Sequence, residues 1–85
     1  MSAKEKLINR FLTKPKDFTY DELRKLLRYF GYEEESLGKT SGSRVAFINK
    51  ETLHIIRLHK PHPGNELKMY QVDQLIETLK NQEVI

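Results

Sequence analysis

The chain has 85 residues, of which 38% are hydrophobic and 32% are charged, and its net charge at pH 7 is +3. This length predicts one domain, residues 1–85, with a small core, and the content of Leu, Ile, Phe and Tyr excludes a disordered chain. The absence of cysteine excludes disulfides and thiolate metal sites, and no apolar run is long enough for a membrane span or a signal-peptide core, so we expect a cytoplasmic protein.

Basic and acidic residues alternate in blocks along the chain. Residues 39–68 carry six Lys and Arg residues against two Glu residues, and all three histidines lie in this block. A basic face on a small domain favours a polyanionic partner such as nucleic acid. An ordinary solvated surface is the alternative explanation of the same charge.

Two helices are predicted in the first third of the sequence. Helical spacing of apolar residues predicts a helical extension within residues 1–15, which Lys14 and Pro15 end. A second helix is predicted over residues 20–30, because Thr19 and Glu22 form a capping box and Gly31 is placed to end it. The apolar stripes are Leu7, Ile8, Phe11 and Leu12 in the first helix, and Leu23, Leu26, Leu27 and Phe30 in the second, with Phe18 and Leu23 as a hydrophobic staple.

A small antiparallel sheet is predicted for the middle of the chain. We expect an edge strand over residues 34–39, a strand over 43–48, a turn over 49–51 and a partner strand over 52–58. Alternation places Leu53, Ile55, Arg57 and His59 on one face of the last strand, and His54, Ile56 and Leu58 on the other.

A last helix is predicted over residues 70–81, after a loop rich in Pro and Gly. Its apolar stripe comprises Val72, Leu75, Ile76 and Leu79. The element order therefore predicts the α+β class, in two layers, with helices packed on a small antiparallel sheet.

Several kinds of chemical site find no support in the sequence. His59 and His62 lie three residues apart, but His54 is the only further histidine and cysteine is absent, so we expect no metal site. Ser41 and Ser43 flank one glycine but lack the G-x-S-x-G pattern of a nucleophile elbow. No glycine-rich phosphate loop is present, and we expect no cofactor.

The remaining candidate chemistry is phosphate binding by cationic side chains near one sheet edge. Arg, Lys and His position phosphates, and serine hydroxyls add hydrogen bonds. The predicted RNA- or phosphate-binding residues are Lys39, Ser43, Arg44, Arg57, His59, Lys60, His62 and Lys68. The alternative for the loop is that Pro61, Pro63 and Gly64 shape it and the histidines only make hydrogen bonds within it.

Three segments together resemble the HicA family: "YDELRKLLRYFGY", "SGSRVAF" and "HPGNELK", the last followed by the final helix. The resemblance covers residues 19–80 and leaves the N-terminal helical extension outside. HicA proteins are small bacterial toxins of toxin–antitoxin pairs that cleave messenger RNA. The resemblance implies a fold like that of double-stranded-RNA-binding domains, in the order α-β-β-β-α.

The sequence departs from the family pattern at Arg44. Family members typically carry a histidine directly after the Gly-Ser pair, and this histidine is thought to act as the general acid or base when an RNA 2′-hydroxyl attacks the neighbouring phosphate. Arginine stays protonated and cannot act as a base, although it binds phosphate and stabilises negative charge. The candidate catalytic residues are therefore His59, His62 and Arg44, and His54 is a further histidine on the same strand.

The resemblance implies a HicA-like toxin that binds messenger RNA, acts on it as an endoribonuclease if another group replaces the histidine, and is neutralised by a HicB-type antitoxin. The alternative is a catalytically silent module of the same fold that binds RNA or a protein. Arg44 favours the alternative, and the surrounding motifs favour the toxin.

Overall fold

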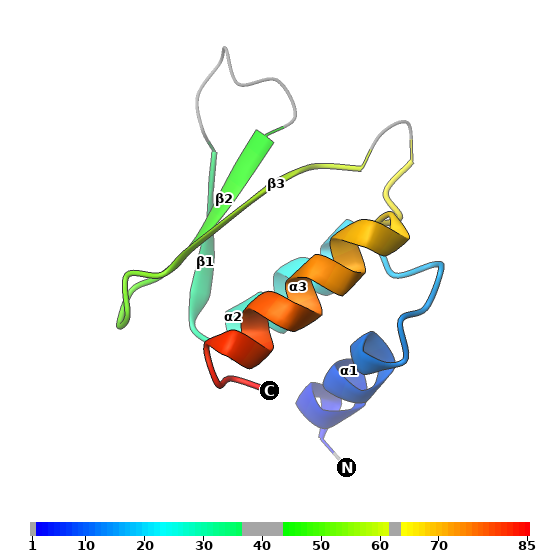
Figure 1. Ribbon diagram of the computed structural model, residues 1–85, viewed down its shortest axis with the longest axis horizontal. Helices are drawn as coiled ribbons and strands as arrows, with labels where there is room; N and C mark the ends of the chain where they lie inside the picture. Colours follow the sequence, from blue (N-terminus) through cyan, green and yellow to red (C-terminus); the bar gives the residue numbers. More distant parts are fainter. Residues whose placement is uncertain (1, 37–43, 62–63) are drawn as a thin grey trace.

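A computed structural model describes residues 2–36, 44–61 and 64–85. The elements in chain order are α1 (Ala3–Leu12), α2 (Tyr20–Tyr29), β1 (Tyr32–Ser36), β2 (Arg44–Asn49), β3 (Ile55–His59) and α3 (Met69–Asn81). This order confirms the predicted α+β class, with α1 added before an α-β-β-β-α core (Figure 1). Among the described residues, no helix has the length and apolar character needed to cross a membrane.

The three strands form one antiparallel sheet in the order β1-β2-β3. Side chains alternate between its two faces, and α2 and α3 lie on the same side of it (Figure 1). On the face toward the helices, Val45, Phe47 and Ile56 are buried in the same core cluster as the apolar stripes of α2 and α3. The opposite face, which we call the outer face, carries exposed Arg44, Arg57 and His59.

The limits of α2 follow from local chemistry, as predicted. Thr19 and Glu22 make both hydrogen bonds of a capping box, and Phe30 is the C-cap residue. Gly31 then adopts φ +94°, a left-handed conformation that glycine reaches without a steric penalty. The strand that follows begins earlier than expected, at Tyr32, and the residues 37–39 of the predicted edge strand lie outside the described part of the chain.

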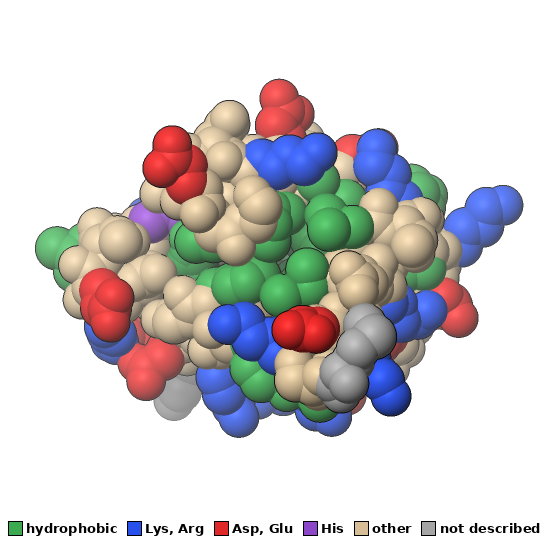
Figure 2. Space-filling view, turned by 90° about the horizontal axis from the view of Figure 1, so that it is seen from below, with side chains coloured by type: hydrophobic (Ala, Val, Ile, Leu, Met, Phe, Trp, Pro, Cys, Tyr) green, Lys and Arg blue, Asp and Glu red, His purple; other side chains and the backbone are tan. Residues whose placement is uncertain are grey.

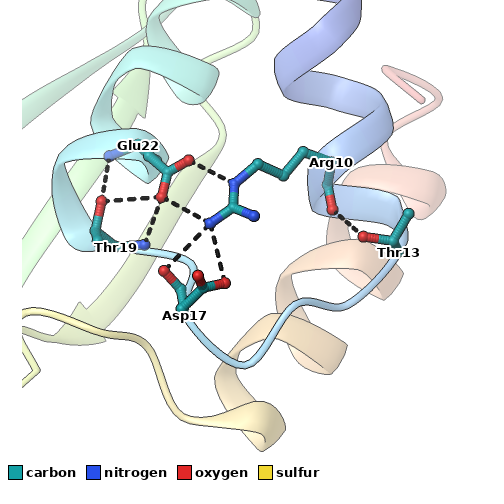
Figure 3. Close-up of polar contacts among 5 residues, drawn as sticks. All are labelled: Arg10, Thr13, Asp17, Thr19 and Glu22. Atoms are coloured by element: carbon teal, nitrogen blue, oxygen red, sulfur yellow. Dashed lines mark hydrogen bonds and ion pairs between the residues drawn. The ribbon is translucent and has the colours of Figure 1, made fainter.

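Helix α1 is attached to the core by the buried Phe11 and by Arg10, together with the half-buried Leu7 and Ile8. Phe11 is completely buried, with its ring centroid 5.1 Å from that of Phe18. The Arg10 guanidinium donates to Glu22 Oε2 at 2.7 Å and to Asp17 Oδ1 at 3.1 Å (Figure 3). Leu12, which the sequence assigned to the apolar stripe, is instead 40% exposed.

Glu22 connects α1 to the N-terminal cap of α2. Its Oε1 accepts from the Thr19 backbone N–H at 3.1 Å, while its Oε2 accepts from Arg10 (Figure 3). These hydrogen bonds, chiefly the one from Arg10, lower the pKa of Glu22. The same carboxylate thus caps one helix and holds the other.

The β2–β3 turn is longer than predicted. Asn49 Oδ1 accepts from the backbone N–H groups of Glu51 and Thr52, and Leu53 N–H donates to the Asn49 carbonyl at 2.7 Å. Leu53 has φ +62° and is 72% exposed, so the prediction that residues 52–54 belong to the strand is wrong. The side-chain hydrogen bonds of Asn49 favour a wrapped turn over continued pairing.

The loop before α3 is fixed against the entrance of α2. Tyr20 N–H donates to the Asn65 carbonyl at 2.7 Å, and Leu67 N–H donates to the Phe18 carbonyl at 2.8 Å. Leu67 is buried in the core. These contacts hold the N-terminal end of α3 close to the end of β3, which determines the site described below.

The side of the molecule formed by α1 and the C-terminus is partly apolar. Leu7 and Ile8 of α1, with Val84 and Ile85 of the C-terminal tail, are half-buried against the core. Figure 2, which views this side, shows hydrophobic side chains gathered in the middle with charged side chains around them.

Candidate nucleic-acid interface

Arg44 and His59 lie directly opposite each other on β2 and β3. The Asn49 N–H donates to the His54 carbonyl, and His59 accepts at its carbonyl from Gln71 Nε2 of α3 at 3.1 Å. Because backbone groups alternate in direction along a strand, Arg44 and His59 form a non-hydrogen-bonded pair, in which side chains approach more closely and Cα atoms are about 4.5 Å apart. A cation and an imidazole therefore share one small area of the outer face.

A third basic residue, Arg57, extends this area along β3. Arg57 is opposite Ala46, which is itself buried, so the exposed surface at this position comes from Arg57. Arg44, Arg57 and His59 are all exposed. We call these three residues the outer basic cluster.

Within the described part of the chain, no carboxylate forms an ion pair with the outer basic cluster. Among the described residues, every ion pair involves other cations. The remaining stretches of the chain, residues 1, 37–43 and 62–63, contain no Asp or Glu. The cluster is thus available to an external anion.

A hollow of about 250 Å³ adjoins the cluster at the N-terminal end of α3. It is lined by His59, Lys60, Pro61, Lys68, Tyr70 and Gln71. Lys68 precedes the first turn of α3, so its ammonium adds to the partial positive charge of a helix N-terminus. His59 borders both the hollow and the outer basic cluster, and it joins them into one cationic surface.

Two further contacts position Lys60 and His59. Lys60 Nζ lies 5.7 Å from the centre of the Tyr20 ring, and the Tyr20 hydroxyl donates to Glu34. Burial, with the hydrogen bond to Glu34, raises the pKa of Tyr20, so this tyrosine stays protonated. Gln71, which is buried, accepts from Lys68 N–H at 3.0 Å while donating to the His59 carbonyl, and so ties the end of β3 to the start of α3.

The β1 side of the outer face has a different charge arrangement. Lys50 Nζ lies 3.5 Å from Glu33 Oε2 and 3.3 Å from Glu35 Oε1. The hydrogen bond to Glu35 is the main reason that the pKa of Lys50 is raised. Here the cation is paired within the protein, in contrast to the outer basic cluster.

His54 does not belong to the site, although it was a further candidate. Its Nδ1 lies 2.7 Å from the hydroxyl of the buried Tyr32. It precedes β3, however, and is opposite Asn49, five residues or about 16 Å along β2 from Arg44. The idea that His54 reaches the area around Arg44 is wrong.

Of the residues predicted to bind phosphate, five lie in the described part of the chain and come together: Arg44, Arg57, His59, Lys60 and Lys68. Lys39, Ser43 and His62 lie outside the described residues. The sequence analysis did not identify Tyr70 and Gln71 as site residues. Both lie in the first turn of the predicted last helix, directly after "NELK", and this position was the signal that could have identified them.

A family model for the HicA toxin of bacterial toxin–antitoxin systems matches residues 20–80. The chain belongs to the HicA toxin family. No curated protein and no solved structure matches it. The match begins at the first residue of α2, so α1 and its Arg10 attachment lie outside the family region. Family membership makes the protein a toxin of a toxin–antitoxin pair, with an antitoxin as its partner.

Proposed function

We propose that this HicA toxin binds messenger RNA in the cytoplasm across the outer basic cluster and the adjoining hollow, and cleaves it slowly with His59 as the proton acceptor. A HicB-type antitoxin neutralises it. The observation that carries the proposal is the direct pairing of Arg44 and His59 on an exposed face, where neither forms an ion pair with a carboxylate of residues 2–36, 44–61 and 64–85.

The charge of the surface supports RNA as the ligand. Arginine forks bind phosphate oxygens in a bidentate manner, and lysines contribute point charges along the backbone. The outer basic cluster provides two arginines, and Lys60 and Lys68 border the neighbouring hollow. A single strand crossing both areas would place successive phosphates against them.

The pairing of Arg44 with His59 supports cleavage. The resemblance to the family implies a histidine at the position of Arg44, and an arginine cannot accept a proton. In the proposed reaction, His59 takes the proton of a 2′-hydroxyl, the 2′-oxygen forms a bond to phosphorus, and the bond from phosphorus to the 5′-oxygen breaks. The 5′-oxygen takes a proton from water or from the imidazolium, and Arg44 stabilises the charge on the phosphate oxygens. The products are a 2′,3′-cyclic phosphate and a 5′-hydroxyl.

The first experiment compares cleavage of a mixed-sequence single-stranded RNA by the wild type, His59→Ala and Arg44→His. Loss of general base catalysis costs roughly 10²–10⁴-fold, so His59→Ala should lose nearly all cleavage while still binding RNA. Arg44→His restores the family residue and should cleave faster than the wild type. Detection of a cyclic phosphate end identifies the reaction.

His54→Ala is the matched histidine control. His54 is at the far end of the hairpin, so its removal should leave the rate of cleavage per folded molecule unchanged. If His59→Ala cleaves as fast as the wild type, the role of His59 as the proton acceptor is wrong.

A second candidate function follows from Arg44 itself. If neither the wild type nor Arg44→His cleaves RNA but both bind it, the protein is a binding module that sequesters RNA without cutting it. Arg44 favours this function because a permanently charged guanidinium binds phosphate but transfers no proton. Affinity measured by fluorescence anisotropy on labelled RNA separates binding from cleavage.

A further inference from the structure

The free edge of the sheet, strand β3, has unpaired backbone groups. Backbone groups alternate in direction along β3, and the Asn49–His54 and Gln71–His59 hydrogen bonds fix this alternation. The N–H and C=O groups of Ile56 and Leu58 therefore point toward β2, and those of Ile55 and Arg57 point away from it. Among the described residues, nothing accepts from or donates to these outward groups of Ile55 and Arg57. Such an edge is a template for one more strand.

A groove runs beside this edge, between β3 and α3. It measures about 200 Å³, and Ile56, Leu58 and Leu75 provide apolar side chains within it. Tyr70, Gln74 and Thr78, spaced one helical turn apart, form the wall on α3. Side chains of an added strand that point to the helix side would enter this groove.

The positive charge around the groove favours an acidic peptide segment as its ligand. Arg57 and His59 line it, and Lys60 and Lys68 line the hollow next to it. Neither Asp73 nor Glu77, the two acids of α3, is among the residues that line the groove. RNA would neutralise the positive charge, but its backbone has no alternating N–H and C=O groups that could pair with the strand edge. It also has no apolar side chains that could fill the apolar floor of the groove.

We propose that an extended, acidic segment of the antitoxin pairs with β3 as a fourth strand and fills the groove along α3. Backbone hydrogen bonds to Ile55 and Arg57 supply the register, apolar side chains at alternate positions enter the groove, and carboxylates meet Arg57, His59 and Lys60. This inference rests on the proposed function only in having a protein antitoxin as partner. Because Arg57 and His59 belong to both surfaces, the bound segment also blocks RNA.

Amide hydrogen exchange measured by nuclear magnetic resonance tests the strand pairing without any substitution. The probe is the protein encoded next to the gene of this chain, mixed with the full-length chain. In the free chain, the amides of Ile55 and Arg57 should exchange fast while those of Ile56 and Leu58 exchange slowly. In the complex, Ile55 and Arg57 should slow by about tenfold or more, because their hydrogen bonds to the added strand must open first.

Exchange rates of Ile55 and Arg57 that stay within about twofold of the free chain in the complex would overturn the proposal, as would the absence of a complex. Concentration-dependent protection of the same amides in the chain alone would identify a second copy as the occupant, which also overturns it.

Two variants test the hydrogen bond and the groove separately. Arg57→Pro removes the outward N–H as well as the charge, and proline is tolerated at an edge position of this kind; Arg57→Ala removes the charge alone. Arg57→Pro should therefore bind the antitoxin about three- to tenfold more weakly than Arg57→Ala. Thr78→Trp fills the groove from the half-buried position of Thr78 on α3 without adding charge, and it tests the docking mode if Arg57→Pro fails to fold.

The RNA assays on these variants separate the two proposals. Thr78→Trp should weaken antitoxin binding by about tenfold or more and leave RNA cleavage unchanged, since it adds no charge and Thr78 does not line the hollow at the start of α3. If Ile55 and Arg57 are protected in the complex but the chain neither binds nor cuts RNA, the proposed function is wrong and the docking mode stands. If the chain cleaves RNA but Ile55 and Arg57 are not protected in the complex, only the docking mode is wrong.

Discussion

Arg10 and Arg44 show two opposite uses of arginine in one small protein. Arg10 sits between α1 and α2, with Glu22 and Asp17 within hydrogen-bonding distance, and its guanidinium also lies 5.7 Å from the centre of the Phe18 ring. Arg44 lies on the outer face of the sheet beside His59, where it forms no ion pair with any described carboxylate. The first arginine serves the fold, and the second belongs to the surface proposed to bind RNA.

The difference predicts that stability and RNA binding use separate parts of the molecule. Substitutions at the α1–α2 junction should change the free energy of unfolding, and substitutions in the outer basic cluster should change RNA binding. The following predictions test this separation, from the largest expected effect to the smallest.

Phe11→Ala should produce the largest loss of stability. Phe11 is completely buried against Phe18, and removing a buried phenyl ring costs about 3–5 kcal/mol. Urea unfolding followed by circular dichroism measures the loss. RNA affinity per folded molecule should not change, and a large fall in that affinity would show that α1 takes part in binding.

The double variant Arg44→Ala, Arg57→Ala should lose RNA affinity and keep its stability. Two phosphate contacts fewer should reduce the slope of log affinity against log salt by about 1.4 for a single strand. Exposed substitutions of this kind usually change the free energy of unfolding by less than about 0.5 kcal/mol. Lys25→Ala, on the exposed side of α2, controls for charge and should leave the slope unchanged.

Thr19→Ala should destabilise the protein by about 1 kcal/mol, because it removes the side chain that caps α2. Thr13→Ala is the comparison, since the hydroxyl of Thr13 only donates to the Arg10 carbonyl at the exposed end of α1. Thermal unfolding should show a smaller loss for Thr13→Ala than for Thr19→Ala. Equal losses would contradict the importance given to the cap of α2.

The contribution of Glu22 to the free energy of unfolding should disappear at low pH. Its pKa is lowered in the folded protein, so the stabilisation is fully present above the unfolded-state pKa of about 4.3 and is lost as the pH falls through the folded-state pKa. The free energy of unfolding of the wild type should therefore exceed that of Glu22→Gln at pH 7, and the gap should close below about pH 4. Urea titrations of both proteins across this range measure the gap; a constant gap would show that ionisation of Glu22 contributes nothing.

Lys50→Ala should have the smallest effect. Lys50 pairs with Glu33 and Glu35 on an exposed surface, where solvent and salt screen ion pairs. Thermal unfolding should show little change in stability, and the small loss should shrink further in high salt. A loss as large as that of Thr19→Ala would show that the three charges act as a network.

The sequence by itself determined the order of the elements, because the signals involved are local. The capping box of Thr19 and Glu22, the left-handed Gly31 and the apolar stripe of α3 each depend on residues within a few positions. The same local signals supported the HicA resemblance, and the family match over residues 20–80 confirmed it. The five basic residues now seen together could also be named in advance, since strand alternation places Arg57 and His59 on one face.

Only the tertiary structure decided which histidine accompanies Arg44. The turn after β2 depends on side-chain hydrogen bonds of Asn49, and its added length removed Leu53 and His54 from the strand and placed His59 opposite Arg44. The contacts of Asn65 and Leu67 with the entrance of α2 then brought Lys68 and Gln71 to the end of β3. Register and loop closure join residues far apart in the chain, and no local pattern encodes them.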